Sequence, residues 1–320
     1  MAASAETKAT ALSPVARHGQ LRIIGGRLCD AKGDAVQLKG MSSSGLQWFG
    51  AIVDEASFTA LERDWNCDVI RLALYVGEGG YATHPELMRL VTKGVDLAVK
   101  LGMYVIVDWH VLNPGNPNDP VYSGGADFFE AMAKAYGSMP NILYEIMNEP
   151  NGSLNWAKDL KPYATKIVST IRAIDPDNII LIGSGRWSQD VDYAADDPVA
   201  GTNLMYTVHF YAGTHGSILR GKISRALAEG AAVFCSEWGT SEASGDGGPF
   251  IKESDEWLSF LDDNGISWVN WSLSDKKESS AAFKNLALDA TEDGIRIWSA
   301  DRLSASGAYV RSRMKRIPPE

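Results

Sequence analysis

The sequence predicts one α/β domain, a (β/α)8 TIM barrel preceded by a short β-hairpin. From residue 35 onward, short β-branched or aliphatic runs alternate with longer segments of helical periodicity, as in repeated βα units around a parallel sheet. A chain of 320 residues suits a single barrel domain. Polar side chains also gather where the predicted strands end, the end of a barrel that carries function.

Eight runs are predicted as strands, in the order Val36 to Met41, Val69 to Tyr75, Tyr104 to His110, Ile142 to Glu149, Ile179 to Gly183, Leu204 to Tyr211, Ala232 to Trp238 and Ile266 to Leu273. Amphipathic helices are predicted between them at Pro85 to Leu101, Asp127 to Tyr136, Trp156 to Ile174, Ile218 to Glu229 and Ile251 to Asp263. Gly102, Gly230 and Gly265 follow three of these helices, where a left-handed residue commonly ends a helix.

The segments outside the strand and helix repeat define the domain limits. Leu21 to Cys29, with Gly25 and Gly26 at its centre, predicts a hairpin that could close the lower end of the barrel. The catalytic domain is expected at 20–317, after a tail at 1–19 that is flexible or was added for expression, and before a short stub at 318–320. Residues 1–20 lack the apolar core of a signal peptide.

Composition limits the classes of partner. The 40 acidic and 30 basic residues give a formal net charge of −10, which argues against nucleic acid or an anionic membrane as a partner. The sequence lacks an apolar run of about 18 residues, the length needed to span a bilayer. Cys29, Cys67 and Cys235 are widely separated, so buried free thiols are expected, although one disulfide is compatible with the spacing.

Two carboxylates are the main candidates for chemistry. Glu149 and Glu237 each end an otherwise apolar run, where a charge is costly to bury unless it is paired, hydrogen-bonded or used chemically. Either glutamate alone is explained by a structural ion pair or a loop anchor. Together, at the ends of the predicted fourth and seventh strands, they indicate acid/base and nucleophilic catalysis on a glycosidic bond.

Strand alternation adds supporting residues, because side chains two apart share one face of a strand. His209 with Tyr211, Asp108 with His110, and Cys235 with Glu237 are therefore expected to face the same way. Glu145, Met147 and Glu149 form a similar set. On the interior face, Glu145 and Asp108 would support the site, or would form a buried ion pair with arginine.

Seven motifs in this order resemble one family, the retaining glycoside hydrolases of family 5, and within it the bacterial endo-β-1,4-glucanases, or cellulases. The resemblance runs from about Gly40 to Lys276. It rests on Gly40-Met41-Ser42-Ser43 with Gly45-Leu46-Gln47-Trp48, on Ile70-Arg71-Leu72, Asp108-Trp109-His110, Asn148-Glu149-Pro150, His209-Phe210-Tyr211-Ala212, Ser236-Glu237-Trp238-Gly239-Thr240, and Trp271-Ser272-Leu273-Ser274-Asp275-Lys276.

The resemblance implies a double displacement without a cofactor or metal, with Glu149 as the general acid/base and Glu237 as the ionised nucleophile. Arg71 and Tyr211 would stabilise the charge of Glu237. The other implied contacts to the sugar or to the catalytic groups come from Asn148, His110, His209, Trp271 and Trp48, and more weakly from Lys276, Glu278, Tyr75 and Ala243. The family also implies a cis peptide bond between Trp271 and Ser272.

One position departs from the family pattern. Ser44 stands where related cellulases commonly have a histidine. A serine hydroxyl is shorter and cannot carry a charge, so weaker substrate binding is expected rather than altered chemistry.

Several alternatives stay open beside an endo-β-1,4-glucanase. A β-mannanase or a xyloglucanase would use the same scaffold, and a carbohydrate-binding barrel would have lost its chemistry. His110 and His209 could instead be ligands of a metal-dependent hydrolase, although neither has a second ligand at close spacing. The expected partner is a β-glucan polysaccharide or oligosaccharide, the expected state is a monomer, and the expected location is extracellular.

Overall fold

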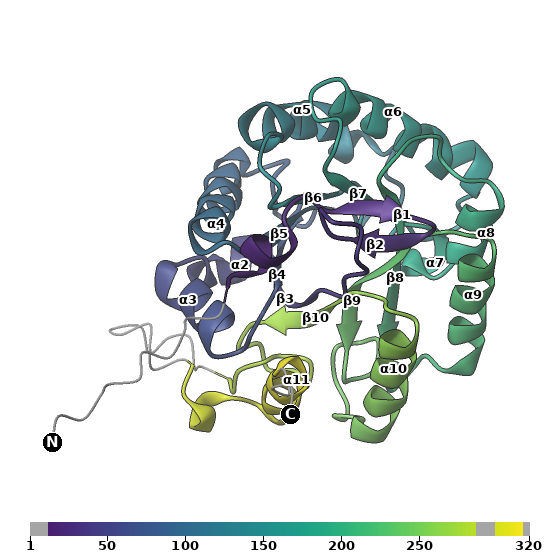
Figure 1. The fold of residues 1–320 in the computed structure, drawn as a ribbon. Coiled ribbons are helices and arrows are strands. Elements are labelled where there is room, and N and C mark those ends of the chain that lie inside the picture. The colour runs from purple at the N-terminus through teal and green to yellow at the C-terminus, as the bar shows by residue number, and fades with distance from the viewer. Residues whose placement is uncertain (1–11, 286–297, 316–320) are drawn as a thin grey trace, which may run out of the picture.

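In the computed structural model, which describes residues 12–285 and 298–315, eight parallel strands close into a barrel (Figure 1). Around the barrel the strands follow the chain, and the last pairs with the first. Their bounds are β3 (Lys39–Ser43), β4 (Val69–Tyr75), β5 (Tyr104–His110), β6 (Ile142–Glu145), β7 (Ile179–Ile182), β8 (Leu204–Tyr211), β9 (Val233–Gly239) and β10 (Trp268–Leu273). The predicted fold class is confirmed.

Helices surround this barrel on the outside (Figure 1). They are α2 (Leu46–Phe49), α3 (Glu55–Arg63), α4 (Met88–Leu101), α5 (Gly125–Tyr136), α6 (Lys161–Arg172), α7 (Gly185–Ser188), α8 (Val191–Asp196), α9 (Ser217–Ala228), α10 (Ile251–Asp263) and α11 (Ala305–Met314). The five predicted helices correspond to α4, α5, α6, α9 and α10, and all three predicted glycine stops have positive φ. The sequence prediction omitted α3, although the Asp54 side chain caps its first turn by accepting from the Ser57 amide.

Strand boundaries differ from the prediction at two places that matter for the site. The first barrel strand begins at Lys39 and runs to Ser43, rather than from Val36 to Met41. β6 ends at Glu145, not at Glu149, so Glu149 lies on the segment that follows the strand. An apolar run does not by itself reveal where the hydrogen-bonded ladder stops.

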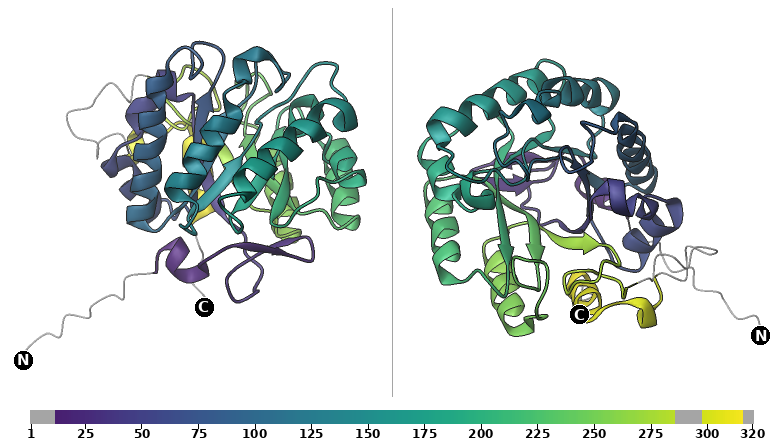
Figure 2. Two further views of the ribbon diagram at one scale, coloured as in Figure 1. Left: turned by 90° about the horizontal axis from the view of Figure 1, so that it is seen from above. Right: turned by 180° about the vertical axis from the view of Figure 1, so that it is seen from behind.

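The lower end of the barrel is closed by the hairpin of β1 (Arg22–Ile24) and β2 (Arg27–Cys29), as predicted (Figure 2, left). Helix α1 (Pro14–His18) lies beside it. The Val15 amide donates to the Gly102 carbonyl, and Arg17 pairs with Asp68 at 2.7 Å. Residues 14–18 of the predicted tail at 1–19 are therefore not flexible, because these contacts fix them to the barrel. Residues 1–11 and 318–320 lie outside the described residues.

The barrel interior changes character along its axis. Near the hairpin it is an apolar cluster, referred to below as the lower core, that includes Leu38, Val69, Ile106, Leu143, Phe234 and Val269. One step further up, the same strands contribute Arg71, Asp108 and Glu145, all fully buried. The charged layer is thus enclosed between the lower core and the open upper end.

Two other sequence predictions can be checked in the described part of the chain. All three cysteines are buried and free. Among the described residues, no helix combines the length and apolar character needed to cross a membrane.

Candidate active site

A cavity of about 640 Å³ opens at the carboxyl ends of the barrel strands. Its lining includes ten predicted site residues: Tyr75, His110, Glu149, His209, Tyr211, Glu237, Ala243, Trp271, Lys276 and Glu278. Arg71 and Asn148 are fully buried and do not line the cavity themselves. They reach it through hydrogen bonds to groups that do.

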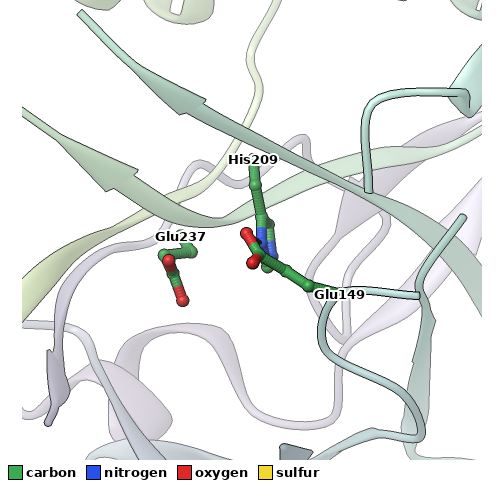
Figure 3. A group of neighbouring side chains, drawn as sticks. All are labelled: Glu149, His209 and Glu237. Carbon is green, nitrogen blue, oxygen red and sulfur yellow. Dashed lines mark hydrogen bonds and ion pairs between the residues drawn. The ribbon is translucent and has the colours of Figure 1, made fainter. Parts of the chain in front are cut away.

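Glu149, from the segment after β6, and Glu237, from β9, converge in this cavity (Figure 3). One carboxylate oxygen of Glu149 lies within 4.8 Å of one oxygen of Glu237. This upper bound agrees with the short spacing of retaining glycosidases, about 5–5.5 Å, rather than the about 6.5–9.5 Å of inverting ones. The geometry leaves room for a sugar carbon between the groups but not for an additional nucleophilic water.

Both oxygens of Glu237 accept hydrogen bonds from neighbouring side chains. The Tyr211 hydroxyl donates to Oε1 at 2.7 Å, and Arg71 Nη1 donates to Oε2 at 3.0 Å. Burial and the nearby Glu237 charge raise the pKa of Tyr211 well above its usual value, so this hydroxyl stays a donor. A carboxylate with both oxygens bonded to fixed donors is held in one orientation, as a nucleophile requires.

Arg71 is itself surrounded by carboxylates. It contacts Glu145 at 2.6 Å and Asp108 at 3.0 Å, and it donates to the Asn148 side-chain oxygen at 2.5 Å. Burial alone would lower the pKa of Arg71, but the three carboxylates outweigh this effect and raise it. Glu145 and Asp108 therefore meet both expectations. They form buried ion pairs with Arg71, and in doing so they fix the guanidinium that contacts Glu237.

Glu149 has a different environment. Its side chain is partly exposed, and its Oε1 lies 2.8 Å from His209 Nδ1. Burial would lower the pKa of His209, but hydrogen bonds to Glu145 and Glu149 outweigh it and raise the pKa to about 9. The partner of Glu149 is therefore a histidine, which can give up or take a proton, whereas the partners of Glu237 are Tyr211 and Arg71, which keep their protons.

His110 is the second buried histidine, and it is neutral. Burial and the Arg71 charge lower its pKa to about 3. Its Nδ1 lies 2.6 Å from Asp108 Oδ2, and its Nε2 lies 3.1 Å from the Asn148 amide nitrogen. Because the Asn148 nitrogen can only donate, the network assigns the proton of His110 to Nδ1. Asp108 therefore orients His110, which in turn orients Asn148.

Aromatic rings form one wall of the cavity. Tyr75 stacks on His110 with centroids 4.0 Å apart, and His110 stacks on Trp271 at 5.6 Å. The peptide bond from Trp271 to Ser272 is cis, as the family pattern predicted. Trp48 packs edge-on against Tyr75 at 5.1 Å and is 55% exposed, so it lies beside the cavity. Ser44, which precedes the Gly45-Leu46-Gln47 segment, is buried.

Lys276, Glu278 and Ala243 lie on neighbouring loops at the rim. Lys276 and Glu278 pair at 2.6 Å, and the Ala243 amide donates to the Thr214 hydroxyl at 2.8 Å. Glu278 also accepts from the Ser280 hydroxyl. These contacts place the Lys276 ammonium group at the edge of the cavity, where it can reach the hydroxyl groups of a bound ligand.

A β-bulge in β9 overturns one predicted face. Thr207 of β8 is paired with Phe234, but His209 is paired with Glu237, so β9 contains one residue more than its neighbour between these pairs. Phe234 and Ser236 therefore point into the barrel, as does Glu237, while Cys235 packs in the outer cluster. The prediction that Cys235 and Glu237 share a face is wrong for this reason.

The related prediction on the fourth strand is wrong for Met147. Glu145 faces the interior, but Met147 packs with Ile146 in the outer cluster between strands and helices. The strand ends at Glu145, and alternation does not apply beyond it. The two other pairs, Asp108 with His110 and His209 with Tyr211, do share a face.

Sequence reasoning missed the part of the cavity that includes Arg186, Trp187, Gln189 and His215. Trp187 is 47% exposed and belongs to α7, a left-handed turn in which Arg186, Trp187 and Ser188 have φ of 52°, 57° and 55°. Each such residue costs about 1–2 kcal/mol. The turn persists because the Trp187 amide donates to Pro150 and the Ser188 hydroxyl to Asn148. A tryptophan just after the predicted fifth strand was the available signal.

Glu149, His209 and Glu237 also lie close enough to hold a cation, with one ligand atom each within 4.8 Å of the others. Their hydrogen bonds oppose this use. Both oxygens of Glu237 accept from Tyr211 and Arg71, and both ring nitrogens of His209 face Glu149 and Ser236. A histidine with a pKa raised to about 9 has no free lone pair at neutral pH, so the donor set does not fit a metal.

Comparisons with known proteins agree with this geometry. Residues 29–277 match the model of the family described as Cellulase (glycosyl hydrolase family 5). Endoglucanase 5 of Pectobacterium carotovorum subsp. carotovorum is 50% identical over 308 residues, which are 96% of this chain and 60% of that protein. The chain therefore spans about three fifths of that relative.

Solved structures give the same result. A GH5 cellulase from an Icelandic hot spring isolate, described as thermostable and highly halotolerant, has a TM-score of 0.90 at 47% identity, with 95% of this chain and 97% of that chain covered. A variant of the Thermobifida fusca endoglucanase Cel5A catalytic domain, solved with cellotetraose, has a TM-score of 0.89 at 37% identity, covering 94% and 99% of the two chains. The chain belongs to the cellulase family, glycosyl hydrolase family 5.

Proposed function

We propose that this protein is a retaining endo-β-1,4-glucanase that cleaves internal bonds of cellulose or a related β-glucan. The observation that carries the proposal is the pair of carboxylates within 4.8 Å, one fixed by Arg71 and Tyr211 and the other paired with His209. Family membership supports it, as does the cellotetraose bound by a structural neighbour.

In the first step, an oxygen of Glu237 attacks the anomeric carbon and forms an ester bond to the sugar. The bond from that carbon to the glycosidic oxygen breaks with its electron pair, and Glu149 donates a proton to the departing oxygen. The donors on Glu237 orient it for attack. Asn148 is fixed by Arg71 and His110 behind the residues that line the cavity, and the sugar contact that the family resemblance implies for it stays a prediction.

In the second step, Glu149 accepts a proton from water while the water oxygen bonds to the same carbon and the ester to Glu237 breaks. Two inversions give net retention. Glu149 ends the cycle protonated and Glu237 ends it ionised, so no external acid, base or cofactor is consumed.

The rest of the cavity supplies sugar contacts. The faces of Trp271 and Tyr75 suit the apolar faces of glucose rings, with Trp48 beside them. Lys276, Glu278 and Ala243 also line the cavity and would contact further rings, and the contact implied for Ser44 stays a prediction. The Trp187 amide donates to the carbonyl of Pro150, the residue after Glu149, and this supports a contact of Trp187 with the leaving group.

The decisive experiment is NMR of the products during cleavage of a cellooligosaccharide. Retention predicts that the new reducing end appears first as the β-anomer, and first appearance of the α-anomer would contradict the proposal. Rates on carboxymethylcellulose, glucomannan and xyloglucan then identify the preferred polymer, with a mannanase or a xyloglucanase as the competing outcomes. Turnover that survives a chelator agrees with a mechanism without metal.

We also propose that the protein acts outside the cell and as a monomer. A polysaccharide substrate does not enter cells, and all the groups proposed for catalysis lie within one barrel. Activity in the culture supernatant tests the location, and light scattering coupled to size exclusion tests the oligomeric state.

A further inference from the structure

A chain of hydrogen bonds leads from Glu149 into the interior of the barrel. His209 Nδ1 lies 2.8 Å from Glu149, and its Nε2 lies 2.9 Å from the Ser236 hydroxyl. The Ser236 hydroxyl in turn donates to Glu145 Oε1 at 2.7 Å. Ser236, Glu145 and His209 are all essentially inaccessible to solvent, so bulk water cannot replace these partners.

The direction of this chain follows from the chemistry of its inner end. Burial would raise the pKa of Glu145, but Arg71 and His209 outweigh it and lower the pKa, so Glu145 is a carboxylate and only accepts. Ser236 has one hydroxyl hydrogen, and it donates this hydrogen in the hydrogen bond to Glu145. The Ser236 oxygen must therefore accept from His209, which places a proton on Nε2.

The fixed proton on Nε2 leaves Nδ1 to face Glu149. With a lone pair, Nδ1 accepts from the Glu149 carboxylic acid; with a proton, it donates to the Glu149 carboxylate. The two arrangements differ by the position of a single proton across 2.8 Å. The other neutral tautomer of His209, or a ring turned by 180°, would lose the hydrogen bond from Nε2 to the Ser236 hydroxyl.

The bulge in β9 is the structural device that brings Ser236 to His209. In a regular strand Ser236 and Glu237 would face opposite sides, and only one of them could enter the barrel. The extra residue between the pairs Thr207–Phe234 and His209–Glu237 allows both to point inward. One strand thus carries the Glu237 nucleophile and the hydroxyl that orients the base partner.

Other charged groups face this chain from the neighbouring strands. Arg71 from β4 contacts Glu145, and Asp108 and His110 from β5 lie on the far side of Arg71. Glu237 from β9 and Tyr211 from β8 face Glu149 across the cavity, and Tyr75 completes the wall. Arg71 is shared among three carboxylates, so the negative charge of Glu145 is only partly compensated there.

We propose that Ser236 and Glu145 are positioning residues that fix the His209 imidazole and retain one exchangeable proton in the Glu149–His209 pair. This inference rests on the proposed function. The partly compensated charge of Glu145, transmitted through Ser236, stabilises the pair while it holds the proton. The pair therefore keeps its exchangeable proton to higher pH than it would without Ser236 and Glu145, and this sets the alkaline limit of the reaction.

The test compares Ser236→Thr with Ser236→Val, which have nearly the same shape but differ in the hydroxyl, together with Ser236→Ala, which adds no bulk. Each variant is assayed from pH 4 to 11, an interval that brackets the His209 pKa of about 9. One substrate is a cellooligosaccharide, which needs a proton for its leaving group. The other is a dinitrophenyl cellobioside, whose first step needs none.

The expected result is that Ser236→Val and Ser236→Ala lower kcat/KM for the cellooligosaccharide by about tenfold. This is a fraction of the rate enhancement of about 10²–10⁴ that general acid catalysis typically supplies. Their alkaline limb should move to lower pH by about one unit, while the acid limb stays in place. The kcat/KM for the dinitrophenyl substrate should change by less than about threefold, and Ser236→Thr should keep the alkaline limb of the parent.

Coincident alkaline limbs for the Thr and Val variants would overturn the proposal. Equal losses on both substrates at every pH would overturn it as well, because they indicate only a packing role. Melting temperatures identify variants that fail to fold, in which case the Ala variant decides. These outcomes are distinct from failure of the proposed function, in which the parent enzyme itself would show no turnover or the wrong anomer.

Discussion

The two ends of the barrel interior are built from the same strands but obey different rules. On β4 and β6, Val69 and Leu143 belong to the lower core, and Arg71 and Glu145, two residues further along, carry buried charges. The lower core gains its stability from apolar burial that any residues of suitable shape can supply. The charged layer depends on specific partners, because a buried charge that loses its partner is strongly destabilising.

This contrast shows how a barrel can contain an active site without losing its stability. The hairpin and the lower core close one end and exclude water. The charged layer above is then held in a rigid frame, and only Glu149 retains appreciable contact with solvent among the groups around Arg71 and His209. Substitutions at the two ends should therefore separate activity from stability.

The largest effect is expected for Glu237→Gln at the upper end. The amide keeps hydrogen-bonding capacity but is not a nucleophile, so kcat should fall by at least about a thousandfold. The melting temperature should be equal or higher, because Arg71 then balances two carboxylates instead of three. Hydrolysis of cellooligosaccharide and calorimetry measure the two quantities. A large loss of stability would show that the charge of Glu237 is structural.

Arg71→Met is expected to reduce both activity and stability. It leaves Asp108, Glu145 and Glu237 buried without their shared cation, which should cost about 3–5 kcal/mol of unfolding free energy. Activity should also be lost because Glu237 is no longer oriented. Denaturant unfolding gives the first value. A folded variant of normal stability would mean that the carboxylates take up protons at little cost.

Leu38→Ala probes the lower core with the opposite expectation. Leu38 is fully buried under the hairpin, and its truncation should cost about 2–5 kcal/mol. The kcat of the folded fraction should stay within about twofold of the parent, since the charged layer lies above an otherwise intact core. Activity at 20 °C and urea unfolding measure both. A change in the pH profile would contradict the separation of the two ends.

The smallest effect concerns pH. His110 binds a proton with a pKa of about 3 in the folded protein and about 6.5 in the unfolded chain. The unfolded state therefore binds more protons between these values, and stability falls as the pH drops through this window, by up to about 1.4 kcal/mol per pH unit. Urea unfolding at pH 6.5 and 4.5 measures the slope, with His110→Gln as the control. An unchanged slope in that control would assign the effect to other groups.

Several features were predictable from local sequence. The strands β4, β5 and β8 were predicted with correct bounds, since continuous apolar runs bounded by turn residues are typical of parallel strands. Glu149 and Glu237 could be identified because a charge at the end of an apolar run needs an explanation. The motif order then related most of the cavity lining to one family.

Tertiary structure alone decided the remaining features. The sequence does not show that β9 bulges, because a bulge is defined by the register against a neighbouring strand; hence Ser236 was not recognised and Cys235 was misplaced. Trp187 depends on a left-handed turn held by the Asn148–Pro150 segment. The order of the barrel strands and the identity of the proposed catalytic pair can be predicted from local sequence, because burial and chain direction are local properties. The proton position on His209 cannot, because it results from contacts among residues distant in sequence.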